Sequence, residues 1–383
     1  MMKLVRLEFF RFALQLVDSN SFMEPLKNMY SPDLLKSIGE QIKKEYSSFD
    51  HKNWMKHFVT SEWKVAELKQ RVNLIALAFY DTLPKDYNQA IDILKPVSNQ
   101  MSYGYAGVIF SEFVMLYGRQ HWDKSMEAMA VFTQTSTAEF AIRQFILDDP
   151  KKAMRQMVQW SKSDNHHIRR LSSEGCRPRL PWGVKLSMFV NDPTPCLEIL
   201  NRLKSDPELY VRKSVANHLN DISKDNPMIA LQLAKEWYGK NANSDWVVKH
   251  GLRGLLKAGN VEALKILGQS ASKHLSVTQH RVHQKKVLLG DRISFTVEIV
   301  NASKHEEQLR LEYAIDYMKS NGQTSRKVFQ WINKMVEPGA HRFEKNQILK
   351  DITTRKHYEG KHGWAVVVNG EEKGSASFEL HFE

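Results

Sequence analysis

Apolar side chains recur at helical spacing through the middle of the chain. In YVRKSVANHLNDIS, which begins at Tyr210, the apolar residues are three or four positions apart and share one helix face. These residues are Val211, Val215, Leu219 and Ile222. Asp caps a helix and Pro fits its first turn, so an Asp-Pro pair marks a helix start. Such pairs occur at Asp149-Pro150, Asp192-Pro193 and Asp206-Pro207. The pattern predicts many short helices.

Three segments of this helical region resemble one another. They are HIRRLSSE from His167, YVRKSVANHLND from Tyr210 and WVVKHGLRGLLK from Trp246, at successive offsets of 43 and 36 residues. These offsets are close to the length of HEAT and armadillo repeats. We therefore expect an irregular solenoid of helix pairs.

A polar stripe accompanies the apolar one. Lys213, Asn217 and Asp221 follow each other at every fourth position, and Arg170 with Glu174 occupy the matching positions of the preceding repeat. The following repeat supplies Lys249, Arg253 and Lys257. Equivalent helix faces of a solenoid line one concave surface, which would here be basic with carboxylates set into it. A single stripe of this kind is more often an ordinary solvated helix face.

Glu139 and Arg143 show the same spacing of acid and base one helix pair earlier. After the first repeat comes LSSEGCRPRLPWG, from Leu171 to Gly183, whose two prolines prevent the preceding helix from continuing. In this stiff loop Arg177 and Arg179 could hold phosphates, and Trp182 could pack on a sugar or base. Alternatively, Trp182 and Leu180 fill a gap between helices while the arginines face water.

Near residue 275 the apolar period changes from helical spacing to two. RISFTVEIV and LRLEYAIDY alternate apolar with polar residues, and Asn369-Gly370 predicts a hairpin connection between two further strands. About 100 residues of short strands indicate an immunoglobulin-type β-sandwich. The predicted fold is thus an all-α HEAT-like repeat solenoid followed by an all-β immunoglobulin-like sandwich. The predicted parts are an N-terminal extension (1–22) upstream of a start at Met23, the helical domain (23–270), a linker (271–285) and the sandwich (286–383).

Charge favours a polyanionic partner. The 383 residues include 55 Lys and Arg against 43 Asp and Glu, a formal net charge of +12. Nucleic acid is the first candidate and a membrane surface the second. No apolar run approaches the roughly 20 residues that span a bilayer. Glu8 and Arg11 interrupt the first residues, which therefore lack the apolar core of a secretory signal.

Cysteine and histidine do not indicate a metal site. Cys176 and Cys196 do not form a CxxC pair, so we predict neither a disulfide framework nor zinc, and a reducing cytoplasm fits best. His166 and His167 are adjacent and would point apart on a helix. We predict no metal and no cofactor.

Three strings carry a resemblance to a known family. They are EPLKNMY (24–30), SSEGCRPRLPW (172–182) and YVRKSVANHLNDISKD (210–225), and they resemble the AlkC branch of the HEAT-like repeat alkylpurine DNA glycosylases. The resemblance covers roughly residues 23–267. Some family members also carry a C-terminal immunoglobulin-like domain. The family hydrolyses N-glycosidic bonds of cationic alkylated bases for base excision repair and is thought not to extrude the lesion.

The resemblance implies a monomeric enzyme that acts on duplex DNA containing alkylated bases, with 3-methyladenine, 3-methylcytosine and 1-methyladenine as candidate lesions. It places Glu139, Arg170, Glu174, Trp182 and Asp221 at the lesion. A base methylated at N3 is already cationic and leaves without a strong acid, so carboxylates are needed mainly for the sugar cation and a water. We predict Glu174 and Asp221 as the catalytic pair, with Glu139 assisting. The predicted DNA contacts are Arg143, Arg169, Arg177, Arg179, Arg212, Lys213, Lys249, Arg253 and Lys257.

Two other functions remain open from the sequence. The solenoid could be a non-catalytic scaffold for DNA or an acidic protein, because Arg170 and Glu174 can form a simple ion pair one helix turn apart. A bifunctional glycosylase could use Lys185 or Lys213 as a Schiff-base nucleophile, but nothing in the sequence marks either lysine as desolvated.

Overall fold

The computed structural model describes residues 25–269, 272–352 and 355–382. The predicted N-terminal extension, residues 1–22, lies outside the described residues. The chain forms two compact units: one ends at Cys176 and adds Leu180–Leu186, and the other comprises Arg177–Arg179 and the chain from Ser187 onward. The division falls in the proline-containing loop, within the region that the sequence predicts as one helical domain.

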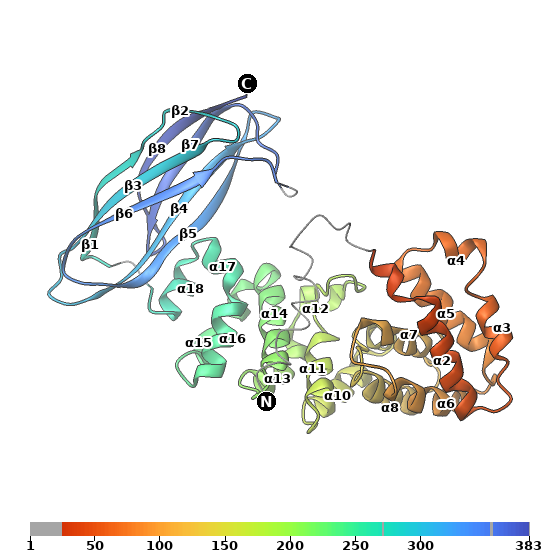
Figure 1. Cartoon of the computed structure of the whole chain (residues 1–383). Helices are drawn as coiled ribbons and strands as arrows, with labels where there is room; N and C mark the ends of the chain where they lie inside the picture. Colours follow the sequence, from red (N-terminus) through yellow and green to blue (C-terminus); the bar gives the residue numbers. More distant parts are fainter. Residues whose placement is uncertain (1–24, 270–271, 353–354, 383) are drawn as a thin grey trace, which may run out of the picture. The chain divides into compact units, whose positions relative to one another are not determined.

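The described part of the first unit is helical (Figure 1). Its elements are η1 (Leu26–Met29), α2 (Pro32–Glu45), α3 (His51–Lys56), α4 (Ser61–Val65), α5 (Leu68–Thr82), α6 (Tyr87–Asn99), η2 (Tyr105–Gly107), α7 (Val108–Tyr117), α8 (Trp122–Phe132), α9 (Ile142–Asp148), α10 (Pro150–Trp160) and α11 (His166–Glu174). Helix α5 packs on α7 and α6 packs on α8. Stacked aromatic rings fill the core, with Phe79 5.2 Å from Trp54 and 5.7 Å from Phe110 between ring centroids. Asp149 caps α10, as predicted, because its side chain accepts from the Lys152 N–H at 2.9 Å.

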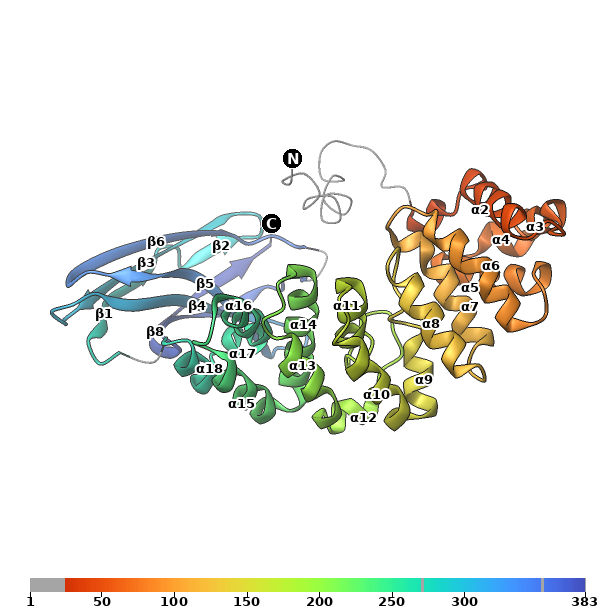
Figure 2. The same cartoon turned by 90° about the horizontal axis from the view of Figure 1, so that it is seen from below.

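The second unit begins with helices that continue the repeat pattern (Figure 2). They are α12 (Ser187–Asn191), η3 (Thr194–Cys196), α13 (Leu197–Leu203), α14 (Leu209–Asp225), α15 (Pro227–Trp237), α16 (Ala242–Gly251), α17 (Arg253–Lys257) and α18 (Val261–Ile266). The predicted apolar face of α14 is buried against its neighbours, α15 and α16 among them. Asp206-Pro207 does not cap α14: Asp206 accepts from the Glu208 N–H in a turn, and the helix starts after it.

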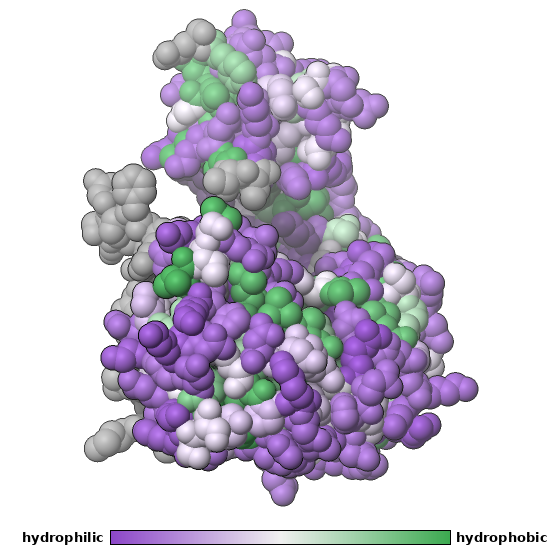
Figure 3. Space-filling view, turned by 90° about the vertical axis from the view of Figure 1, so that its right-hand side faces the viewer, coloured by the Kyte–Doolittle hydropathy of each residue, from purple (hydrophilic) through white to green (hydrophobic). Residues whose placement is uncertain are grey.

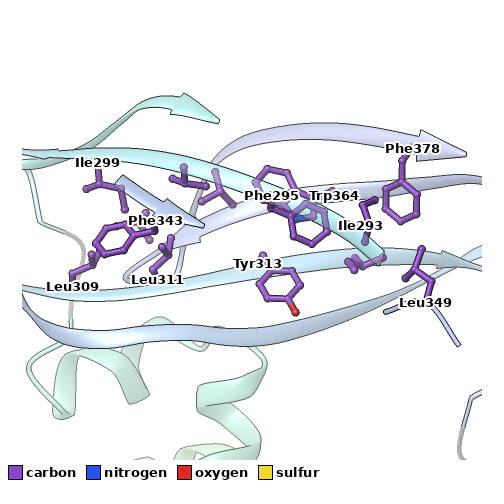
Figure 4. Packing of buried hydrophobic residues seen from close by; sticks show 14 of the residues in the cluster. Ile293, Phe295, Ile299, Leu309, Leu311, Tyr313, Phe343, Leu349, Trp364 and Phe378 are labelled. Atoms are coloured by element: carbon purple, nitrogen blue, oxygen red, sulfur yellow. The ribbon is translucent and has the colours of Figure 1, made fainter. Parts of the chain in front are cut away.

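The strands of the second unit form a two-sheet sandwich. They are β1 (Leu275–Val282), β2 (Lys286–Leu288), β3 (Arg292–Asn301), β4 (Glu307–Met318), β5 (Thr324–Val336), β6 (Gly339–Ile348), β7 (Gly360–Val368) and β8 (Glu371–His381). One sheet has the order β1-β3-β6 and the other β2-β8-β7-β4-β5. Alternate residues of β3, β4 and β7 point into the core, where Phe295 packs between Tyr313 and Trp364 (Figure 4). The predicted sandwich is therefore confirmed.

Strand β1 corrects the predicted linker. Segment 271–285 contains Leu275–Val282, which pairs with β3 along most of its length. Most of its side chains are exposed, and a register shift after Val277 interrupts the apolar alternation on which the prediction of strands depended. The predicted hairpin between β7 and β8 is present, and Asn369 and Gly370 both have the positive φ that such a turn requires, 50° and 84°.

Polar residues dominate the molecular face shown in Figure 3, where apolar residues form small separate patches. None of the helices in the described residues is long and apolar enough to cross a membrane.

Candidate nucleic-acid interface

Three predicted lesion-facing residues meet in the first unit. Arg170 and Glu174 lie one turn apart on α11, and Glu139 lies just before α9. The Arg170 guanidinium pairs with Glu139 Oε2 and lies 3.6 Å from Glu174 Oε1. Thr137 Oγ1 donates to Glu139 Oε2 at 2.8 Å and accepts from Arg170 Nη1 at 3.1 Å. The structure therefore holds two carboxylates around one cation.

This group of Glu139, Arg170 and Glu174 is largely removed from water, with 12%, 13% and 7% of the side chains exposed. Arg170 contacts both acids, so one guanidinium fixes the position of two carboxylates. Because solvent screening is weak in such a site, charges on these side chains act strongly on a cation placed next to them.

Asp221 lies in the second unit, on α14, and is 2% exposed. Its Oδ2 accepts from Arg177 Nε at 2.9 Å, while Oδ1 accepts from Lys224 Nζ at 3.3 Å. One turn later Asp225 binds Arg179 through two bonds of 2.6 Å. The two loop arginines therefore attach to two carboxylates of α14.

This pairing buries one of the predicted phosphate contacts. The Arg177 side chain is 8% exposed and binds Asp221, so it does not face solvent as we expected from the loop sequence. Its partner comes 44 residues later, and no local pattern indicates it. Arg179 is 39% exposed, and its hydrogen bonds to Asp225 raise the pKa of its guanidinium.

Arg143, another predicted phosphate contact, also does not reach the surface. It is fully buried, and it donates to the carbonyls of Gly175 at 2.9 Å and Val184 at 2.7 Å. The prediction assumed that Glu139 and Arg143 share one helix, but α9 begins at Ile142 and Arg143 points inward. Its bonds instead join the two ends of the loop that carries Trp182.

Trp182 is 58% exposed, so it does not fill a gap between helices; Leu180, at 5%, is the buried residue of this loop. The φ of Trp182 is 65°, a left-handed conformation that costs a residue other than glycine about 1 kcal/mol or more. Its carbonyl accepts from Lys69 Nζ at 2.6 Å, and its indole lies edge-on to Tyr105 with 6.2 Å between ring centroids. The contacts with Lys69 and Tyr105 thus hold the indole in an exposed position at the surface.

A cavity of about 200 Å³ lies against Trp182. Four polar residues that line it were not predicted as site residues from the sequence: Lys69, Tyr105, Glu112 and Gln144. Burial raises the pKa of Glu112, and the pKa of Tyr105 is raised by burial and then by the charges of Glu139 and Glu112. Lys69, Tyr105 and Glu112 come from segments before the recognised repeats, so no repeat pattern indicates them.

Arg169 and Arg212 occupy equivalent positions of two repeats and make equivalent bonds. Arg169 Nη1 donates to the carbonyls of Ser163 and Asp164, just before α11. Arg212 donates likewise to the carbonyls of Asp206 and Pro207, before α14. These equivalent hydrogen bonds support the predicted repeat. Each arginine also ties its helix to the backbone segment that precedes the helix.

The remaining predicted cations lie in the second unit and are exposed: Lys213, Lys249, Arg253 and Lys257. The last three line a groove of about 530 Å³ together with Lys345 and aromatic residues of the sandwich. Arg253 donates to Asn217 Oδ1 at 3.0 Å, which joins it to the polar stripe of α14. Burial and the nearby Arg177 lower the pKa of Arg253.

Comparisons with known proteins show the family to which the chain belongs. Residues 133–255 match the family model "DNA alkylation repair enzyme", and residues 276–382 match "Uncharacterised protein YhaZ, C-terminal Ig-like domain". Uncharacterized protein YhaZ of Bacillus subtilis (strain 168) is 38% identical over 359 residues, which are 94% of this chain and 100% of that protein. The alkylpurine DNA glycosylase AlkC of Pseudomonas fluorescens, solved bound to DNA containing an abasic site analog, is 38% identical, with a TM-score of 0.85 over 94% of this chain and 100% of that one. The chain therefore belongs to the AlkC branch of the HEAT-like repeat alkylpurine DNA glycosylases, a family of DNA alkylation repair enzymes, and carries a C-terminal immunoglobulin-like domain.

Proposed function

We propose that this protein is a monofunctional glycosylase that removes cationic alkylated bases from duplex DNA without extruding them. The proposed substrates are 3-methyladenine and 3-methylcytosine, with 1-methyladenine as a further candidate. The full-length similarity to AlkC supports this proposal, because that enzyme was solved on DNA with an analogue of the site that base removal leaves. The observation that carries the proposal is the largely buried group in which Arg170 holds the carboxylates of Glu139 and Glu174 together.

The proposed reaction needs no strong general acid. The alkylated base is already positive, so it departs with the electrons of the glycosidic bond and becomes neutral. Positive charge then develops on the sugar, where the carboxylates of Glu174 and Asp221 stabilise it. Water adds at the sugar carbon and gives its proton to a carboxylate, with Glu139 assisting. Arg170 holds Glu139 and Glu174 in place beside the lesion.

The proposed DNA contacts are side chains that are at least partly exposed. Trp182 packs against the nucleotide at the lesion, which the 58% exposure of its indole allows. Phosphates are bound by Arg169, Arg179, Arg212, Lys213, Lys249, Arg253 and Lys257. Arg143 and Arg177 are excluded from this set because both are buried.

One observation favours the rival function of a non-catalytic scaffold. Each proposed catalytic acid has an arginine partner, Arg170 for the first-unit pair and Arg177 for Asp221, as structural ion pairs would. Incubation of methylated duplex DNA with the protein separates the two functions, with the released bases identified by mass spectrometry. We expect free methylated bases; an absence of released base would favour the scaffold.

The same reaction tests whether the enzyme is monofunctional. A lysine Schiff base at Lys185 or Lys213 would be trapped by borohydride as a covalent protein–DNA adduct. We expect released base without a trapped adduct and without strand cleavage. A trapped adduct would establish the bifunctional alternative.

A further inference from the structure

We propose that the cavity beside Trp182 binds a single free nucleobase, the base that the enzyme has just excised. The inference rests on the proposed function, because it takes the released base as its ligand. It adds a product site that lies apart from the carboxylate group. The residues that define this base site are Lys69, Val72, Tyr105, Glu112, Met115 and Trp182.

The size and walls of the cavity fit one flat heterocycle. It measures about 200 Å³ and opens to the surface, whereas about 150 Å³ is enough to bind a benzene ring. Aliphatic side chains and the rings of Tyr105, Phe140 and Trp182 make up its walls. Such surfaces stack on the face of any base, because every base has a π-face.

The polar groups of the cavity select for N–H donors. Glu112 on α7 is a half-buried lining residue, and the hydrogen bond that Glu112 Oε1 accepts from Asn73 Nδ2 is long, at 3.4 Å. A carboxyl group beside this cavity accepts a hydrogen bond from a ligand that brings an amino group. Lys69 lines the same cavity, and its charge offsets part of the cost of burying Glu112. Gln144 offers an amide that can donate and accept.

The mouth of the cavity is fixed before any ligand arrives. Arg143 joins the carbonyls of Gly175 and Val184, and Lys69 donates to the carbonyl of Trp182 at 2.6 Å. These bonds hold Trp182 at a φ of 65°, a conformation that would relax without support. A preformed site loses little conformational entropy on binding.

Tyr105 connects the cavity with the carboxylate group. The charges of Glu139 and Glu112 both act on its phenol and raise its pKa, after burial. Tyr105 also lies edge-on to Trp182 at 6.2 Å between ring centroids. A base that leaves the sugar beside Glu139 would therefore have this aromatic site next to it.

Equilibrium dialysis of the full-length protein with free 3-methyladenine, in the absence of DNA, tests the inference. Three variants accompany the parent: Glu112→Gln removes the charge, Met115→Trp fills the cavity, and Met115→Leu is the volume-conserving control. We expect one saturable site in the parent, about tenfold or more weaker binding in Glu112→Gln, loss of binding in Met115→Trp, and an affinity within about twofold of the parent in Met115→Leu.

Absence of saturable binding to the parent would overturn the inference, and so would equal affinity in the parent, Glu112→Gln and Met115→Trp. Thermal melting shows whether Met115→Trp folds; if it does not, Glu112→Gln decides. Single-turnover base release from methylated DNA is measured separately. Release without binding of the free base would reject the product site and leave the proposed function standing, whereas absence of release would reject the proposed function.

Discussion

The acidic residues of the proposed site are held by arginines. Arg170 contacts both Glu139 and Glu174, and Arg177 contacts Asp221. A planar guanidinium binds carboxylates with two parallel donors, so it fixes their direction as well as their charge. We therefore propose a positioning role for Arg170: it keeps two acids aimed at the place where the proposed reaction forms a sugar cation.

Arg170→Lys tests this role, since it keeps the positive charge and removes the planar geometry. We expect single-turnover base release to fall about 10²-fold, because a small misplacement of reacting groups has an effect of this size. Affinity for DNA with an abasic site analogue should stay near that of the parent. Parental release would show that only the charge of Arg170 matters.

Residue types in the sequence showed which acids and cations were available, but not their partners. Arg143 was predicted as a phosphate contact because its spacing from Glu139 matched the polar stripes, and Arg177 because it lies in a stiff loop after a helix. Their actual partners, the carbonyls of Gly175 and Val184 and the carboxylate of Asp221, come from segments 32 to 44 positions later. Burial of this kind depends on tertiary contacts, and a local pattern does not contain them.

Among the structural elements, the loop after α11 has a backbone held by hydrogen bonds and an indole exposed to solvent. The bonds of Lys69 and Arg143 fix its backbone, and Trp182 adopts a φ of 65°. The prolines of the sequence correctly predicted a stiff loop. The strained residue could not be predicted, because φ at Trp182 is set by anchors on α5 and α9.

Comparing Trp182→Gly with Trp182→Ala separates the strain from the function of the indole. Both variants lose the ring, and we expect kcat/KM for base release to fall about 10- to 100-fold in both. Glycine accepts a positive φ and alanine does not, so the glycine variant should be more stable to urea by about 1 kcal/mol. Equal stabilities would show that the loop relaxes when the indole is removed.

The basic stripe on α16 and α17 is expected to bind phosphates of the duplex. Replacing Lys249, Arg253 and Lys257 together with alanine should weaken binding to damaged and undamaged duplexes alike. Each lost phosphate contact should flatten the slope of log affinity against log salt concentration by about 0.9. Lys151→Ala, an exposed position on α10, is the control and should leave the slope unchanged. An unchanged slope in the triple variant would exclude this stripe as a phosphate-binding surface.

At the scale of the whole molecule, the last helices and the sandwich belong to one compact unit. Arg310 on β4 connects them: it donates to the carbonyl of Leu256 at 3.2 Å and to Gln269 at 3.1 Å. It also pairs with the buried Glu312 at 2.6 Å. The sandwich is therefore fixed to the helix ends by a buried polar group rather than attached through a free linker.

Arg310→Ala should lower the free energy of unfolding of this unit by about 3 kcal/mol or more, because Glu312 would remain buried without its partner. Replacing both residues, Arg310→Met with Glu312→Leu, should recover much of the loss. Urea unfolding monitored by circular dichroism gives both values. A loss below about 1 kcal/mol for Arg310→Ala would contradict a stabilising role for this connection.

The periodicity of apolar residues was sufficient to predict the fold class, because buried positions are mostly apolar. Alternate residues are buried in β3, and every third or fourth residue is buried in α14. The periodicity failed for β1, where a register shift after Val277 interrupts the apolar alternation and most side chains are exposed. The base site was also beyond prediction, because Tyr105, Glu112 and Trp182 come from three separate segments with no shared pattern.

In the proposed reaction, carboxylates of this protein stabilise a sugar cation. Single-turnover release of 3-methyladenine tests this most directly when Glu174→Gln and Asp221→Asn are compared with the parent. Affinity for DNA containing an abasic site analogue is measured in parallel. We expect release to fall about 10²- to 10³-fold in each variant, while affinity for the DNA is kept or tightened because a negative charge has been removed from the protein. Release near the parental rate by both variants would contradict this role of the carboxylates.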